Sequence, residues 1–472
     1  MFGGVFTPSI LTILGVIMYL RFGWVVGNVG LVGTLVIVTL ATSITLLTAL
    51  SVSAIATDQR VRTGGAYYMI SRSLGIETGG AVGIPLYLAQ GLSVALYTVG
   101  FAESLTGAFP ALNARIVGIV TTLAVAALAI VSARAAIRAQ YVIMGLIGLS
   151  LLSLVFGSGL EGVELQGLGA STLENPESFW VVFAVFFPAV TGIMAGVNMS
   201  GDLEDPSRAI PKGTFLAIGV GYVIYMALPV LLALRVDTQS LVSDPLVMRR
   251  ISLWGTAILL GVWGATLSSA VGSILGAPRV LQALARDGIL PRWLSWLGKG
   301  SGEDDSPRAG TAFTLSIALV AVWYGDLNLI APILTMFFLT TYGVLNIAAG
   351  IERFLGSPSF RPRLSVHWIF SLLGAAVPLS AFLGSLVGGV LPSFFASLLD
   401  LGDAHPAPYR YALMVAGCLF VLTIPLVLAT RRPSSRPYSA AATAENAPLM
   451  VIGALSVVAL LASSGVGSTG AF

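Results

Sequence analysis

Long apolar runs, separated by short polar segments, fill the chain from residue 5 to residue 430. A helix that crosses the hydrocarbon core of a bilayer needs about 20 mostly apolar residues. On this rule the sequence predicts an all-α polytopic membrane protein with twelve transmembrane helices, near residues 5–27, 30–56, 81–109, 115–133, 139–157, 177–200, 213–235, 252–284, 310–326, 327–351, 366–390 and 408–430.

Both ends of the chain also follow from the apolar pattern. The first run is long enough to span and has no basic region before it, so we expect a retained helix, not a cleaved signal peptide. The membrane domain is predicted over 1–430, followed by a Ser/Ala-rich linker over 431–446. The C-terminal segment 447–472 holds a further apolar run, 447–464, which either spans the membrane or packs on its surface; its role stays open.

The composition fits this class of protein. Of 472 residues, 24 are Lys or Arg and 21 are Asp or Glu, so 10% are charged, against about 25% in an average soluble domain. Hydrophobic residues make up 56%, and the mean hydropathy is +0.93. These values exclude a soluble enzyme, a disordered chain and a nucleic-acid binder. The single cysteine, Cys418, excludes a disulfide framework, and two histidines leave little for metal chemistry, so no cofactor is expected.

The basic residues predict the orientation. With a cytoplasmic N-terminus, 18 Lys and Arg residues fall in cytoplasmic loops and 5 in outer loops. Short cytoplasmic loops carry the excess of Lys and Arg in membrane proteins. We therefore expect a multi-pass protein of the plasma or inner membrane, embedded in the lipid bilayer, with its N-terminus in the cytoplasm.

Two predicted spans contain helix-breaking patches, 12–17 in the first, with Gly15, and 188–196 in the sixth, with Pro188, Gly192 and Gly196. Interrupted helices at matching places in two halves indicate a transport site. The spacing predicts a 5+5 inverted repeat, with one repeat over 5–157 and the other over 177–351, followed by two more helices over 366–430. The alternative is that the glycines only allow close helix packing.

The middle third of every predicted span lacks Asp and Glu. A cation held there must use backbone carbonyls and hydroxyls, and its unpaired charge is costly in a low dielectric. An anion at the N-termini of half-helices offsets that cost. The residues alone therefore indicate a symporter that carries a cation and an anion together, without a proton relay.

Several motifs in one order resemble the cation–chloride cotransporter family of the amino acid–polyamine–organocation superfamily. They are dense up to about residue 290 and lie at 15–21, 53–57, 64–75, 99–103, 186–193, 200–203, 209–214 and 277–284. The resemblance implies the leucine-transporter-type fold, with broken helices 1 and 6. It also implies electroneutral symport of sodium and chloride by alternating access.

The resemblance implies three sets of ion-binding residues. For sodium, backbone of the first span and an Ala-x-x-Ser-Ser run in the eighth give Leu11, Leu14, Ala265, Ser268 and Ser269. For potassium the candidates are Thr12, Ile13, Tyr97, Pro188 and Thr191. For chloride they are two groups of backbone N–H donors and one hydroxyl, from Gly15, Val16, Ile17, Gly192, Ile193, Met194 and Tyr342.

Some of these assignments have alternatives. The second serine, Ser269, indicates the sodium-dependent branch, although both serines of the run can also bond within their own helix. Thr12 stands where the family carries an Asn, so whether potassium is transported stays open. Tyr97 is equally an ordinary core aromatic.

Charged residues inside or near spans usually pair and mark pathways. By resemblance, Arg21 and Glu103 form an extracellular gate and Asp202 helps to close the cytoplasmic side. Snorkelling of Arg21 and helix capping by Asp202 are the alternatives.

Other functions also stay open. One is a sodium-coupled amino-acid or amine transporter of the same fold, and another is a transport-dead sensor that binds ions and a partner. The expected substrates are inorganic ions, and homodimer formation is undecided. The brevity of the chain, without the long tails of eukaryotic members, indicates a compact prokaryotic member.

Overall fold

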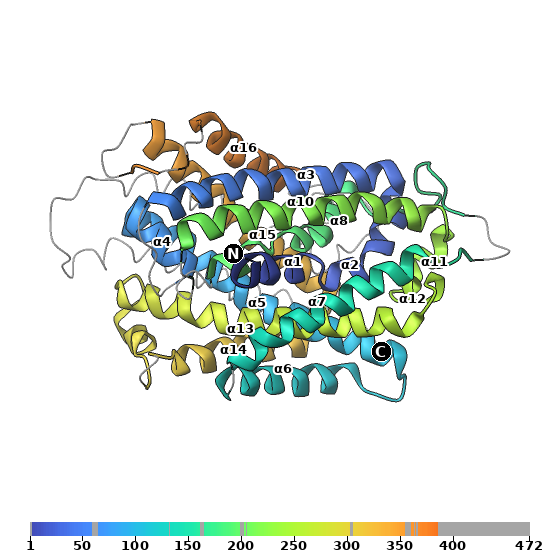
Figure 1. Ribbon diagram of the computed structural model, residues 1–472, viewed down its shortest axis with the longest axis horizontal. Helices are drawn as coiled ribbons and strands as arrows, with labels where there is room; N and C mark the ends of the chain where they lie inside the picture. Colours follow the sequence, from blue (N-terminus) through green and yellow to red (C-terminus); the bar gives the residue numbers. More distant parts are fainter. Residues whose placement is uncertain are drawn as a thin grey trace, which may run out of the picture.

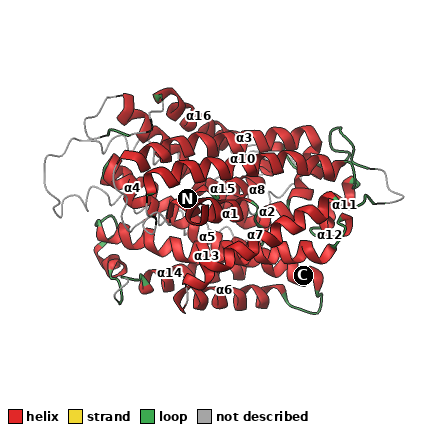
Figure 2. Ribbon diagram, viewed as in Figure 1, coloured by secondary structure: helices red, strands yellow, loops and turns green. Residues whose placement is uncertain are grey.

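The computed structural model describes residues 2–58, 65–131, 133–160, 165–198, 203, 205–302, 305–354, 360–362, 364 and 367–385. These residues are mostly helical, and within them the only β-structure is a single bridge between Ser301 and Ser306 (Figure 2). The predicted all-α membrane class is confirmed. The predicted span 408–430, the linker 431–446, the segment 447–472 and Asp202 lie outside the described residues.

The first half of the chain forms one π-helical turn followed by seven α-helices. They are η1 (Phe2–Phe6), α1 (Thr7–Ile13), α2 (Val16–Leu20), α3 (Phe22–Asp58), α4 (Gly65–Leu74), α5 (Ile76–Ala108), α6 (Ala114–Val131) and α7 (Ala133–Val155).

The second half adds further helices up to residue 385. They are α8 (Phe179–Phe186), the 3-10 helix η2 (Phe187–Val190), α9 (Ile193–Asn198), α10 (Pro206–Ala233), α11 (Thr238–Ser243), α12 (Val247–Ile251), α13 (Gly255–Arg286), the 3-10 helix η4 (Arg292–Gly298), α14 (Arg308–Tyr324), α15 (Leu327–Phe354) and α16 (Trp368–Ser385).

Helices stand at the first eleven predicted spans. Seven helical stretches in the described part of the chain are long and apolar enough to cross a membrane: Phe2–Leu20, Phe22–Asp58, Ile76–Ala108, Phe179–Asn198, Pro206–Ala233, Gly255–Arg286 and Leu327–Arg353. Shorter apolar helices lie at Ala114–Ala129, Ala139–Val155, Arg308–Tyr324 and Ile369–Pro378, where the remaining four were expected. The total of twelve crossings stays a prediction.

The first and second spans meet at Gly30, inside α3. Its backbone is far from helical, with φ 70° and ψ −178°, a region open essentially to glycine alone. A Cβ at this position would lie 2.6 Å from the carbonyl oxygen of Gly169. Gly30 therefore ends one span and starts the next without a loop.

The long helices lie side by side along the long axis of the molecule (Figure 1). α10 packs along α3, and α5 packs against α13 and α15, with α16 beside α15 and α3. α6 and α7 lie at the rim and present exposed apolar side chains, such as Ile116 at 62% and Val142 at 67% exposure. Apolar exposure of this kind suits helices that face lipid.

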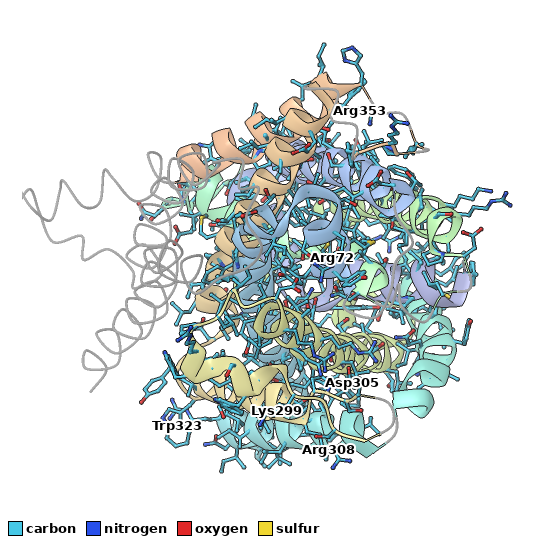
Figure 3. All side chains as sticks on the ribbon, turned by 90° about the vertical axis from the view of Figure 1, so that its left-hand side faces the viewer. Arg72, Lys299, Asp305, Arg308, Trp323 and Arg353 are labelled. Atoms are coloured by element: carbon cyan, nitrogen blue, oxygen red, sulfur yellow. The ribbon has the colours of Figure 1, made fainter. Side chains whose placement is uncertain are left out.

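The sequence pattern missed α4, a short helix in the segment between the predicted second and third spans. Its Tyr67 hydroxyl and its Arg72 guanidinium each donate to a carboxylate oxygen of Asp287, both at 2.9 Å, just past the end of α13. Figure 3 shows this end of the bundle, where Arg72 lies with the basic residues Lys299, Arg308 and Arg353. The helix therefore joins two distant parts of the chain at the basic end.

Candidate functional site

Both predicted patches interrupt their helices. α1 ends at Ile13, Gly15 is extended with φ −97° and ψ −150°, and α2 begins at Val16. In the sixth span α8 gives way to the 3-10 turn η2, and α9 begins at Ile193. Helix ends leave backbone N–H and C=O groups without intrahelical partners. Each break therefore presents carbonyls on one side and N–H groups on the other.

The two breaks lie against each other. A Cβ on Gly192 would lie 2.9 Å from the carbonyl oxygen of Ser9 and 2.9 Å from the backbone nitrogen of Ile13. Two more glycines continue this close approach: a Cβ on Gly196 or Gly213 would lie 2.8 Å from atoms of Val5. Only glycine permits such contacts, so the segment from η1 to α1 is held closely by α9 and α10.

The sodium candidates lie on two helices that contact each other, α1 and α13. Leu11 and Leu14 stand at the end of α1, and Ala265, Ser268 and Ser269 are buried on α13. The Ser269 hydroxyl is buried and has no hydrogen-bond partner within the described part of the chain, which leaves its oxygen available. Sodium, a hard cation, prefers oxygen ligands of this kind.

The potassium candidates all line the two breaks or the neighbouring α5. The Thr12 hydroxyl donates to the Pro8 carbonyl at 2.8 Å, and the Thr191 hydroxyl donates to the Pro188 carbonyl at 2.9 Å. Both threonine oxygens keep lone pairs that could accept a cation. Tyr97 is buried on α5 with 4% exposure.

Sequence reasoning missed Tyr225, which α10 brings to the first break. Its hydroxyl donates to the Ile13 carbonyl at 2.5 Å and so occupies one lone pair of a predicted potassium ligand. Tyr225 is a polar interruption in an otherwise apolar stretch, which is the signal that could have marked it. Its partner lies 212 residues away in the sequence and could not be found from spacing.

The chloride candidates lie at the two breaks, and their role in binding stays a prediction. Gly15 precedes α2, which begins with Val16 and Ile17, and Gly192 precedes α9, which begins with Ile193 and Met194; the first backbone N–H groups of a helix have no intrahelical partner. The buried Tyr342 hydroxyl, on α15, donates to the Thr191 carbonyl at 3.1 Å, which places it beside the second break.

Arg21 and Glu103 form a bidentate ion pair, with N–O distances of 2.7 and 3.0 Å. Their side chains are 8% and 27% exposed. The Arg21 Nε also donates to Asn328 Oδ1 at 2.7 Å, which links the first span, α5 and α15. Asn328 is a missed residue; its place at the polar start of an apolar run was the available signal. The assignment of this pair as a gate, and of Asp202 as its cytoplasmic counterpart, stays a prediction.

The arrangement offers ions carbonyls, hydroxyls and N–H groups rather than side-chain charges. Among the described residues no group of three or more His, Cys, Asp or Glu could hold a metal ion. A buried site of opposed helix ends suits small ions or a substrate with its own charge.

Comparison with known proteins gives a family match and several relatives. Residues 4–429 match the amino acid permease family. Solute carrier family 12 member 2 of Mus musculus is 35% identical, covering 79% of this chain and 36% of the relative. Member 1 of Homo sapiens is 33% identical, covering 79% and 40%, and member 8 of Mus musculus is 36% identical, covering 72% and 50%. The chain thus spans half or less of the length of these curated relatives.

These matches confirm the resemblance drawn from the motifs, because the solute carrier family 12 relatives are cation–chloride cotransporter homologues. They also confirm that the chain is a transporter and not an enzyme. The chain belongs to the amino acid permease family of multi-pass membrane transporters.

Proposed function

We propose that this protein is a secondary active symporter that moves sodium and chloride together, without net charge, by alternating access. The observation that carries the proposal is the contact between the two helix breaks at Gly192. It brings the carbonyl end of α1 close to the N–H end of α9. A cation and an anion bound at these two ends would partly neutralise each other in a low-dielectric site.

The oxygen chemistry supports sodium as the cation. The Ser269 hydroxyl, which has no hydrogen-bond partner among the described residues, lies on α13. The Leu11 and Leu14 backbone lies at the end of α1, which contacts α13. Potassium would be a second cation at the Thr12, Ile13, Tyr97, Pro188 and Thr191 positions. The Thr12 side chain is shorter than the Asn that the family carries at this position, which argues for weak potassium binding.

A flux assay in proteoliposomes tests the proposal. Uptake of a sodium tracer should require chloride on the same side, and membrane potential should not change it. Adding potassium or rubidium then separates the sodium–chloride form from the sodium–potassium–chloride form. Sodium uptake that is indifferent to chloride would overturn the proposal.

A matched pair of variants links the flux to the site. Ser269→Ala removes the available hydroxyl and should raise the half-saturating sodium concentration by about tenfold, the size of one interaction with a charged group. Thr266→Val is the control on the same helix, because the Thr266 hydroxyl already donates to the Val262 carbonyl at 2.7 Å. The control should keep the sodium dependence of the unmodified protein.

A second candidate is sodium-coupled transport of an amino acid or amine. The family match and the N–H groups at the start of α9 favour it, because a substrate carboxylate fits the same donors as chloride. Thermal stabilisation by an amino acid, with none by chloride, would favour this function over the first.

A further inference from the structure

A second layer of polar residues lies two helical turns from the central site. Gln90 precedes Tyr97 by seven residues on α5, and Gly276 follows Ser269 by seven residues on α13. Residues seven apart share one face of a helix and lie about 10 Å apart along its axis. Asn198 ends α9, the half-helix that starts at the second break. The three residues lie toward the end of the bundle that carries α4.

Gly276 lies against the two amide side chains and lets them approach α13 closely. A Cβ at this position would lie 3.1 Å from Asn198 Nδ2 and 3.4 Å from Gln90 Oε1. Gln90 is only 5% exposed, and neither its Oε1 nor its Nε2 has a hydrogen-bond partner in the described part of the chain. Leaving such a buried polar group without a hydrogen bond destabilises the fold. An amide with both ends unpaired in a close-packed core indicates a position that a ligand visits.

The orientation of Asn198 determines which charge this position favours. Its Oδ1 accepts a hydrogen bond from the Ala66 backbone N–H at 3.3 Å. Because a backbone N–H can only donate, the amide oxygen must face Ala66 and the Nδ2 donor must face Gly276. A fixed N–H donor attracts an anion and repels a cation. The Gln90 amide is not fixed by any described partner, so it can turn its own N–H₂ toward the same ion.

We propose that Gln90 and Asn198 form a transit position for chloride between the central site and the α4 end of the bundle. The proposal rests on the proposed function. A chloride ion that leaves the N–H groups of 192–194 meets these amides next along α9. Neutral amides hold an anion loosely, and a position on a conduction path needs binding that is weak enough for release.

Substitution of Gln90 tests the sign of the ion. Gln90→Glu keeps the size of the side chain and places a carboxylate, which repels chloride, at the position; Gln90→Met removes both hydrogen-bonding ends without charge. In proteoliposomes, the maximal rate of chloride uptake should fall by about tenfold or more in Gln90→Glu and by less in Gln90→Met. The half-saturating concentration of chloride supplied at the end of the bundle opposite α4 should stay unchanged, because the central site is intact.

Substitution of Gly276 tests this close approach. Gly276→Ala adds a methyl group against the amides and should slow chloride uptake several-fold. Gly272→Ala is the matched control one turn earlier on α13, where a Cβ would meet no atom within 4 Å. Alanine favours the helix over glycine, so both variants should fold.

The outcomes separate this inference from the proposed function. If sodium uptake by the unmodified protein ignores chloride, both are overturned. If that uptake needs chloride and Gln90→Glu transports as fast as Gln90→Met or the unmodified protein, only the chloride transit position is overturned. The transit position is also overturned if Gln90→Glu and Gln90→Met lower the chloride uptake rate equally and only in proportion to their loss of thermal stability.

Discussion

Arg21 is a charged residue inside the membrane domain. Its side chain is nearly buried, donates two hydrogen bonds to Glu103 and donates another to Asn328 Oδ1. Removing one partner of a buried pair costs more than the pair itself contributes, because the other charge is left unpaired. The arrangement therefore ties together three helices at a single side chain.

Glu103→Gln should lower the free energy of unfolding by about 1–3 kcal/mol, since Arg21 keeps only neutral partners. The apparent melting temperature in nanodiscs measures the change. Asp305→Asn is the control, because it breaks the exposed pair between Arg286 and Asp305, whose side chains are 44% and 56% exposed. An exposed pair contributes less than about 1 kcal/mol. Equal shifts in the two variants would contradict the expected difference.

The same exposed pair predicts a pH dependence. The hydrogen bond from Arg286 holds the pKa of the Asp305 carboxyl below its ordinary value of 3.8. A carboxyl whose pKa is lower in the folded than in the unfolded protein stabilises the folded state at pH values above the unfolded pKa. This stabilisation is lost as the pH falls through the folded pKa. The bridge between Ser301 and Ser306 should therefore keep its hydrogen-exchange protection from neutral pH to about pH 4 and lose it below. Asp305→Asn should show no such step.

Among the helices, α3 contains a backbone position that strongly restricts the type of residue, Gly30. The helix assignment runs through Gly30, yet this residue turns the chain from one span into the next. The sequence predicted a boundary between residues 27 and 30, because two apolar runs met there. It could not predict that the boundary lacks a loop, since this depends on the approach of Gly169 and Ala170 from a distant segment.

Gly30→Ala should destabilise the protein by about 2 kcal/mol or more, through the unfavourable φ and the contact with the Gly169 carbonyl. A lower apparent melting temperature would show this. Gly219→Ala on α10 is the control, because no atom lies within 4 Å of a Cβ there. That variant should be as stable as the unmodified protein or slightly more so.

A buried amide joins α16 to the rest of the described bundle. Asn346 on α15 is 0% exposed, and its Nδ2 shares its two hydrogens among three acceptors, Thr48 Oγ1, the Tyr342 carbonyl and the Gly374 carbonyl, at 2.9, 2.8 and 3.0 Å. Gly374 lies on α16 and Thr48 on α3. One side chain therefore connects three helices, one turn away from the site residue Tyr342.

Asn346→Leu should weaken the docking of α16 by about 1–3 kcal/mol, because the Gly374 carbonyl loses a buried partner. Faster hydrogen exchange over residues 368–385 would show it. Ser316→Ala provides the comparison, since that exposed hydroxyl only bonds to its own helix. Exchange at α16 that is unchanged in Asn346→Leu would rule out this role.

At the scale of the whole molecule, local composition predicted the apolar helices at the first eleven spans and both breaks, but not the short helices between them. Apolar length sets the spans, and glycines and a proline set the interruptions, so both can be read from neighbouring residues. Tyr225 at Ile13, Asn328 at Arg21 and the docking of α4 depend on contacts between residues far apart in the chain. No periodicity within one segment encodes such contacts.

The orientation of the bundle is a prediction at this same scale. Leu253 precedes α13 and Lys299 follows it, so the two lie at opposite ends of a helix about 48 Å long. In a Cys418→Ser background, a membrane-impermeant thiol reagent added to intact cells should label Leu253→Cys and not Lys299→Cys. Labelling of Lys299→Cys alone would place the N-terminus outside.

The glycine-lined contacts of α1 have a consequence for stoichiometry. Val5, Ser9 and Ile13 lie so close to Gly192, Gly196 and Gly213 that the segment from η1 to α1 packs tightly against α9 and α10. A tilt of α1 must therefore carry α9 with it. Carbonyls that would hold a cation and N–H groups that would hold an anion are then withdrawn in one movement. If a cation and an anion bind at these groups as proposed, such a coupled movement would release both ions in the same step and so favour a fixed ratio of cations to anions per cycle.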